Sequence, residues 1–402
     1  MATSEQLILD ELLEEIFLRL PTATDLARAS MVCISFRRVI AGHAFLRRFR
    51  VLHPPPLLGI VSYAFLPAQP PHPSSAVARA VADGADFRCS FLPSLERWRT
   101  SDVRDGRVLL AGAAEGNTYP WDRCAGLLRH FAVCDPLCRR YLVLPVIPDD
   151  LAALVQEPDI DELEYFLAPP ATEDVDGVSF RVMCLAWCKT KLVLFIFSRG
   201  AGQWRSVTFD PGYELESSSK RYYLRRCFCW AVLPDNKLLM LDTERMRFSA
   251  INLPLDPCPE RYELTFVDAG KGRLGMFTIH NRIDREQGGE VIHLRYDILQ
   301  TNRENATRWE LKAMIPLPLT CWYYTIIGVS GGYLLLLGSP KDESSSPSSE
   351  VDSSEVADMD CFSVNLQNGK LEWFCRATDE NETYEANNLY AGFPPSLSAP
   401  TI

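Results

Sequence analysis

Histidine is scarce in this sequence, and the signature motifs of common hydrolases are missing. The 402 residues include six histidines, and neither an HExxH nor a GxSxG arrangement occurs. No pair of nucleophile and base is therefore evident, so the motifs do not identify an enzyme. No apolar run is long enough to span a membrane, and the start of the sequence does not resemble a signal peptide. We therefore expect a soluble protein inside the cell, in the cytoplasm, the nucleus or both.

A concentrated basic surface is also missing. The formal net charge is -11 at pH 7, whereas binding to duplex nucleic acid needs positive charge that replaces counterions. Arginines do cluster over residues 37–50, but without aromatic stacking platforms or groove-reading motifs they indicate a solvated helix face or the rim of a protein interface. The composition therefore argues against nucleic acid as the main partner.

The number and the spacing of the cysteines do not indicate disulfide bonds. The thirteen cysteines are scattered among apolar runs, which indicates reduced core thiols and not a disulfide framework. Cys124, His130, Cys134 and Cys138 offer the ligand types of tetrahedral zinc. Their spacing is unlike that of a zinc knuckle, because the last two straddle a predicted Asp-Pro hairpin. We predict no metal site and no cofactor.

The first fifty residues carry the clearest periodic pattern in the chain. Apolar residues at three- and four-residue steps predict a first helix that Pro21 ends, and Thr22 with Asp25 has the spacing of a capping box that opens a second. A third helix, with Ser35 as the expected cap, ends near Gly42. So small a helical unit is marginal alone and needs a partner for its apolar faces. That partner is either the rest of the chain or another protein.

The order of residues in this segment points to a family. Leu20-Pro21, Leu26, Val32-Cys33, Phe36, Arg37-Arg38 and Phe45-Leu46 stand in an order that resembles the F-box, over about residues 8–50. The resemblance implies docking onto the Skp-type adaptor of a cullin ubiquitin ligase. The residues that it assigns to the adaptor interface are Leu9, Leu12, Leu13, Ile16, Leu20, Pro21, Leu26, Val32, Cys33 and Phe36.

Two positions depart from the family pattern. The chain has Ile8-Leu9 where many F-boxes have Leu-Pro, and Phe36 where many have Trp. Both changes keep apolar volume, so we expect adaptor binding to survive them.

The remainder is expected to be an all-β domain. We expect a helical domain over residues 1–52, a Pro-rich connector over 53–84, and a β domain over 85–402 in which short strand candidates alternate with turns. Recurring hairpins over this length favour a β-propeller of undetermined blade count. A pair of stacked β-sandwiches stays open, because no blade period is established. The "DGRVLL" and "VCDPLCRRYLVLPVIP" segments resemble the F-box-associated β region of plant F-box proteins.

Two acidic segments interrupt the strand pattern. Residues 339–358 are Ser-rich and poor in apolar side chains, which predicts a flexible loop between two strands of one blade. The second segment has an apolar centre at Leu163, Tyr165, Phe166 and Leu167 among many carboxylates. It is interpreted either as an exposed target-binding loop or as residues that fold back into a neighbouring blade.

Two further motifs are interpreted as structural. Gly270, Gly272 and Gly275 satisfy a dinucleotide-binding spacing, but the chain continues as a strand and not as a helix, so a hairpin turn is expected. Ser217 and Lys220 have a Ser-x-x-Lys spacing within a Ser-rich loop. No oxyanion site accompanies them, so both are expected to be solvated.

Together these features predict a non-catalytic substrate receptor of a ubiquitin ligase. The helices hold the adaptor, and the β domain holds a target protein. The alternative is a propeller enzyme or a propeller that binds a small ligand, with the helices as a structural cap.

Overall fold

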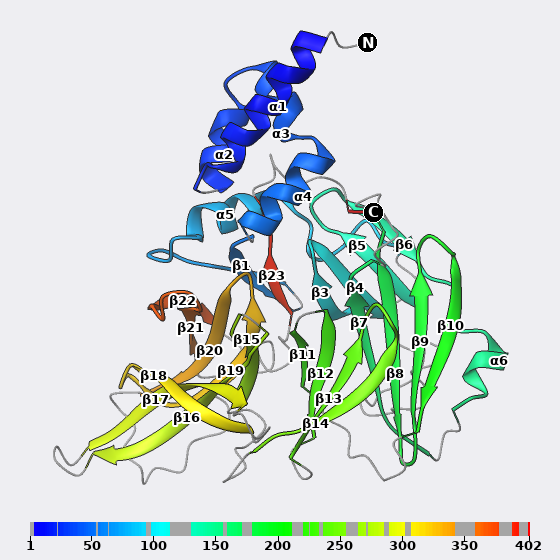
Figure 1. Cartoon of the computed structure of the whole chain (residues 1–402), viewed down its shortest axis with the longest axis vertical. Coiled ribbons are helices and arrows are strands. Elements are labelled where there is room, and N and C mark those ends of the chain that lie inside the picture. The colour runs from blue at the N-terminus through cyan, green and yellow to red at the C-terminus, as the bar shows by residue number, and fades with distance from the viewer. Residues whose placement is uncertain are drawn as a thin grey trace.

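Four helices stand above a ring of β-sheets in the computed structural model (Figure 1). They are α1 (Ser4–Leu18), α2 (Ala23–Ser30), α3 (Ile34–Ile40) and α4 (His43–Leu52). The structure describes residues 4–21, 23–53, 55–62, 64–93, 98–112, 130–155, 159–170, 179–210, 220–224, 226–232, 236–254, 264–270, 272–284, 289–301, 307–341, 358–377, 388–393 and 401–402.

The helices follow the predicted pattern closely. The periodic apolar residues of α1 end before Pro21, and the chain enters α3 through Cys33, whose Sγ accepts a hydrogen bond from the Phe36 N–H at 3.5 Å. The N-cap of α3 is therefore Cys33 and not Ser35. The Cys33 side chain is exposed in this position. The helices enclose a small core whose fully or nearly buried members are Phe17, Leu18, Leu26, Val39, Ile40, Phe45, Leu46 and Phe49.

The strands form five four-stranded antiparallel sheets and one three-stranded sheet. The first blade contains β3 (Trp98–Arg104), β4 (Arg107–Gly112), β5 (Phe131–Asp135) and β6 (Arg140–Val143), and the short helix α6 (Asp149–Ala152) follows it. The second blade contains β7 (Ile160–Ala168), β8 (Arg181–Cys188), β9 (Leu192–Ser198) and β10 (Gln203–Phe209). The third contains β11 (Arg221–Leu224), β12 (Cys227–Val232), β13 (Lys237–Asp242) and β14 (Arg247–Asn252).

The next two blades repeat the same order of strands. The fourth contains β15 (Leu264–Asp268), β16 (Leu274–Asp284), β17 (Gly289–Thr301) and β18 (Thr307–Pro316). The fifth contains β19 (Cys321–Ser330), β20 (Tyr333–Pro340), β21 (Met359–Asn365) and β22 (Leu371–Ala377). The predicted Ser-rich loop joins β20 to β21, which are neighbours in one blade as expected, and residues 342–357 of it lie outside the described residues.

The sixth blade closes the ring with strands from both ends of the β domain. β1 (Leu57–Val61) pairs with β2 (Phe65–Pro67) on one side and with β23 (Leu389–Ala391) on the other. The expected connector over 53–84 therefore contains two strands and the helix α5 (Ser75–Gly84), and the propeller begins at Leu57 and not near residue 85. The five residues of β1 are all buried, but their run is too short and too close to prolines to indicate a strand.

The architecture is a six-bladed β-propeller, so the prediction of a propeller is confirmed and the β-sandwich alternative is wrong. Aromatic side chains fill the space between neighbouring blades: Phe131 and Tyr165 pack at 4.3 Å, and Phe166 and Phe228 at 4.7 Å, between ring centroids. No blade period is visible in the sequence, because the connections within blades vary from tight turns to the segment between β20 and β21.

Most of the cysteines belong to the apolar interior of the ring. The eleven in the described part of the chain are free thiols, and eight of those are buried. Each buried thiol acts as a small apolar side chain.

One aromatic residue joins the helical unit to the ring. Phe393 follows β23, is 4% exposed, and belongs to the same core as Phe17 and Leu26. Its ring lies 6.0 Å from that of Phe49 in α4. Figure 1 shows β23, in red, rising toward α4. The closing strand of the propeller therefore completes the core of the helices.

Replacing Phe393 by Ala tests this junction. Truncating a buried Phe typically costs about 3 to 5 kcal/mol where the site cannot relax. We expect hydrogen exchange of the α3 and α4 amides to accelerate while the amides of β8 and β9 keep their protection. Tyr323→Ala, which truncates a 41% exposed aromatic on β19, is the matched control and is expected to change neither. Unaltered exchange in α4 of the Phe393 variant contradicts the junction.

Candidate functional site

The helical unit exposes large apolar side chains that its own core does not use. Leu9, Leu12 and Ile16 recur at a spacing that places them on one face of α1, and each is more than half exposed. Val32, in the turn between α2 and α3, is 70% exposed, and Ile34, the first residue of α3, is 86% exposed. Isolated exposed apolar residues are ordinary, but several of this size on so small a unit indicate a surface for another protein.

The residues assigned to the adaptor by resemblance fall into three groups. Leu9, Leu12, Ile16, Pro21, Val32 and Cys33 are exposed; Leu13, Leu20 and Phe36 are half-buried; and Leu26 is fully buried. Leu26 is therefore a core residue that supports the fold of the helices. Met31 and Ile34 are exposed and were not predicted. Met31 lies in the turn before α3 and Ile34 is the first residue of α3, so their position at the junction of two helices is the sequence signal for both.

The propeller has a central cavity of about 1040 Å³. The innermost strand of every blade, β3, β7, β11, β15, β19 and β23, contributes to its wall. Pro55, between α4 and β1, lines it as well, and a Cβ built on Gly331 would lie 2.6 Å from the Pro55 carbonyl oxygen. Only glycine therefore fits where the β19–β20 turn meets the segment that leads from the helices.

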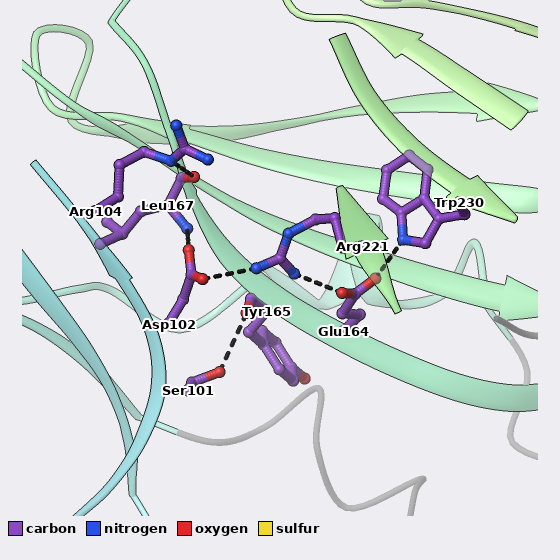
Figure 2. Close-up of polar contacts among 8 residues, drawn as sticks. All are labelled: Ser101, Asp102, Arg104, Glu164, Tyr165, Leu167, Arg221 and Trp230. Carbon is purple, nitrogen blue, oxygen red and sulfur yellow. Dashed lines mark hydrogen bonds and ion pairs between the residues drawn. The ribbon is translucent and has the colours of Figure 1, made fainter. Parts of the chain in front are cut away.

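Arg221 organises one side of this central cavity (Figure 2). Its guanidinium pairs with Asp102 of β3 at 2.6 Å and with Glu164 of β7 at 2.5 Å. The second oxygen of Asp102 accepts the Leu167 N–H at 2.7 Å, and the second oxygen of Glu164 accepts the Trp230 indole N–H at 2.7 Å. Three blades are thus linked by one polar network in which both oxygens of each carboxylate have a partner.

The network is buried, so its electrostatics are sensitive to the loss of any member. Arg221 is 15% exposed at its side chain and its guanidinium lies 4.3 Å from the centroid of the Phe166 ring. Burial raises the pKa of Glu164, and the charge of Arg221 opposes that shift. Removing one partner of such a group leaves an uncompensated buried charge, which is strongly destabilising.

Lys220 occupies a different part of the same cavity wall. It is 7% exposed, and its Nζ donates to the carbonyl oxygens of Ile326 at 2.8 Å and Leu264 at 3.2 Å. Burial lowers its pKa to about 7. The expectation that Lys220 is solvated is therefore wrong, because its side chain is buried against the fourth and fifth blades. Ser217 lies outside the described residues.

The predicted target-binding residues are not on an exposed loop. Leu163, Tyr165, Phe166 and Leu167 lie in β7, where Phe166 is 0% exposed and packs against the third blade, while Tyr165 and Leu167 are buried against the first. Leu163 is half-buried and lines the central cavity. The acidic neighbours suggested a solvated loop, but in a strand the carboxylates alternate with these residues, and Glu164 is held by Arg221. The exposed-loop interpretation is therefore wrong, and these residues fold into the contacts between blades.

The remaining motifs behave as structural elements. Gly270 and Gly272 have φ values of +73° and +77° in the turn between β15 and β16, so the expected hairpin is confirmed. Among the described residues no group of His, Cys, Asp and Glu could hold a metal ion, and Cys124 lies outside them. None of the described helices is long and apolar enough to cross a membrane.

The depressed pKa of Lys220 predicts a pH-dependent stability. An unfolded lysine has a pKa near about 10.4, so between about pH 7 and pH 10 the unfolded state binds more protons than the folded state, and stability from this group rises with pH. We therefore expect the melting temperature of the wild type, minus that of Lys220→Met, to increase as the pH rises across this range. Lys312→Met, at a surface lysine paired with Glu310, is the control and shows a flat difference. A flat difference for Lys220→Met contradicts the burial of a cation here.

Comparisons with known proteins identify the helical unit. Residues 9–48 match the family model of the F-box domain, so the N-terminal helices are an F-box that precedes the propeller. No curated protein matches the chain.

Among solved structures, the chain is similar to a member of the DUF4221 family from Bacteroides vulgatus, with 10% identity over 71% of this chain and 82% of that chain and a TM-score of 0.35. It is also similar to a post-proline cleaving enzyme from Rickettsia typhi, with 9% identity over 68% and 45% of the two chains and a TM-score of 0.31. The fission yeast SREBP-SCAP binding domains match with 8% identity over 77% and 70% and a TM-score of 0.29. Scores this low carry no argument about function.

Proposed function

We propose that this protein is the substrate-recognition subunit of a Skp-cullin-F-box ubiquitin ligase. The F-box binds a Skp-type adaptor and, through it, a cullin, while the propeller holds a target protein. The chain performs no bond chemistry of its own. It raises the effective concentration of a target lysine near the ubiquitin-carrying enzyme, as a bridging module does.

The observation that carries this proposal is the F-box match over residues 9–48 together with the exposed apolar side chains of that segment. Leu9, Leu12 and Ile16 present one face of α1, and Met31, Val32 and Ile34 surround the start of α3. Burying large apolar side chains at the centre of an interface supplies much of its affinity. Phe36 is half-buried against Phe17, with ring centroids 5.0 Å apart, so it supports the helices where many F-boxes have Trp.

The junction at Phe393 supports a bridging role. A receptor has to hold its target at a fixed distance from the adaptor, and a rigid link between the two modules keeps the effective concentration high. Phe393 belongs to the propeller by sequence position and to the F-box by packing. The two modules therefore share one core residue in place of a long linker.

We also propose the cytoplasm or the nucleus as the place of action, since the free cysteines suit a reducing compartment. The resemblance of two strand segments to the F-box-associated β region supports a propeller of the plant type. The target protein is bound by the propeller in this proposal, on a surface other than the buried side chains of Phe166 and Leu167.

A second candidate function is favoured by the central cavity. Its wall carries a satisfied network around Arg221 and a buried lysine from another strand position. Concave sites with a few fixed polar groups are typical of small-ligand binding. The two functions are compatible, because the cavity and the exposed faces of α1 and α3 are made by different residues.

Charge substitutions on the apolar face test adaptor docking. Leu12→Asp combined with Val32→Asp removes two exposed anchors without touching the helical core, and losing one such anchor typically costs about 2 kcal/mol or more, roughly 30-fold in affinity. We expect affinity for a purified Skp-type adaptor, measured by calorimetry, to fall beyond detection while the melting temperature stays unchanged.

Leu319→Asp is the matched control for this experiment. Leu319 is 55% exposed between the fourth and fifth blades, so its charge variant has the same chemistry at a distant site and is expected to bind the adaptor normally. Leu26→Ala, in contrast, should lower both stability and binding, since that side chain is in the core. Full adaptor affinity in the folded double variant would overturn the proposed function.

A further inference from the structure

Lys220 is a buried cation in the wall of an open cavity. Two of the three N–H groups of its ammonium meet carbonyl oxygens, one from Leu264 at the start of β15 and one from Ile326 in β19. In the part of the chain that the structure describes, no carboxylate pairs with it. Buried charges are normally paired, so the third N–H group and the positive charge are available to a ligand inside the central cavity.

The cavity wall formed by blades four, five and six is mostly apolar, and among the lining residues that the structure describes there, Asp268 is the one charged side chain. Blades four, five and six line the cavity with Val267, Ile327, Val329 and Leu389. Blades one and two line it instead with the ionic network of Asp102 and Glu164 around Arg221. Since the carboxylates of that network already have Arg221, Leu167 and Trp230 as partners, they do not supply a counter-charge to Lys220 directly.

We propose that the central cavity binds a small molecule that carries one carboxylate on an apolar or aromatic body. The carboxylate accepts the free N–H of Lys220, and the body lies against the apolar side chains of blades four to six. A volume of about 1040 Å³ is in the range of sites for small ligands. Sites of this kind are usually lined by many apolar side chains and a few polar or charged groups at fixed positions. This inference rests on the second candidate function, small-ligand binding in the central cavity, and does not depend on adaptor docking.

Other charges face the same cavity and limit the ligand to a single anionic group. Those that line it on each element are Arg99, Asp102, Arg104 and Asp105 near β3, Glu162 and Glu164 on β7, Arg221 on β11, and Asp268 on β15. The acidic members outnumber the basic ones apart from Lys220, so a polyanion would be repelled. Arg104 stacks over Tyr223 at 4.2 Å from the ring centroid and donates to the Leu167 carbonyl oxygen, so its charge already has partners within the wall.

Benzoate and its neutral isostere benzamide are the probes. Ligand-observed NMR on the full-length chain is expected to detect benzoate binding and no benzamide binding at equal concentration. Affinity for benzoate should fall by up to about tenfold per pH unit above about pH 7, because the ammonium must be charged to bind the anion while benzoate keeps its charge. Lys220→Met should abolish the binding, and Lys220→Arg, which stays charged, should remove the pH dependence.

A surface variant and added salt show whether benzoate binds at Lys220 itself. Lys312→Met removes a surface lysine and should leave benzoate binding unchanged, and an equal concentration of sodium chloride should not compete. The proposal is overturned if benzoate binds equally to the wild type and to folded Lys220→Met, or if it does not bind at all. If the acetylated, amidated peptide Gly-Glu-Gly binds through Lys220 and benzoate does not, the cavity takes an acidic peptide and the small-molecule assignment is wrong. Loss of adaptor binding in the Leu12 and Val32 double variant changes none of these outcomes.

Discussion

Lys220, which lies directly before β11, and Arg221, the first residue of β11, connect most of the ring. The Arg221 side chain reaches the first and second blades, and the Lys220 side chain reaches the fourth and fifth. Arg221 meets Asp102 and Glu164, while Lys220 meets the Leu264 and Ile326 carbonyl oxygens. The third blade thereby makes polar bonds to four others across the axis. The apolar contacts between blades are non-directional, whereas these bonds fix the angular order of the blades.

The same contacts satisfy several charged groups in the cavity wall. Asp102 and Glu164 are satisfied within the ring, and Lys220 is held by backbone oxygens. The same charged side chains therefore link the blades and line the cavity.

The sequence predicted some parts of the structure well for identifiable reasons. The F-box helices and the all-β remainder follow from local periodicity, because each helix buries one stripe and each strand is short and bounded by turns. Long-range partners have no local signal. The sequence of β1 is that of a connector, and its strand is formed by pairing with the distant β23. The sequence around Leu163 is that of a loop, but neighbouring blades cover both faces of this strand. Lys220 lies in a polar stretch of sequence, but two distant carbonyl groups bind it. Leu26 was placed at the adaptor interface for the same reason, since a pattern marks an apolar position without saying what covers it.

The position of β23 has a consequence for synthesis on the ribosome. The F-box helices emerge early, but Phe393, which fills their core, emerges only after all five complete blades. Until then the helices have an unfilled core and the first strand β1 has an unpaired edge, which is a template for wrong pairing. A product that stops before residue 389 keeps every exposed apolar side chain of the helices yet lacks Phe393, which completes their core. The core of the F-box helices is thereby completed only in chains whose propeller is already complete.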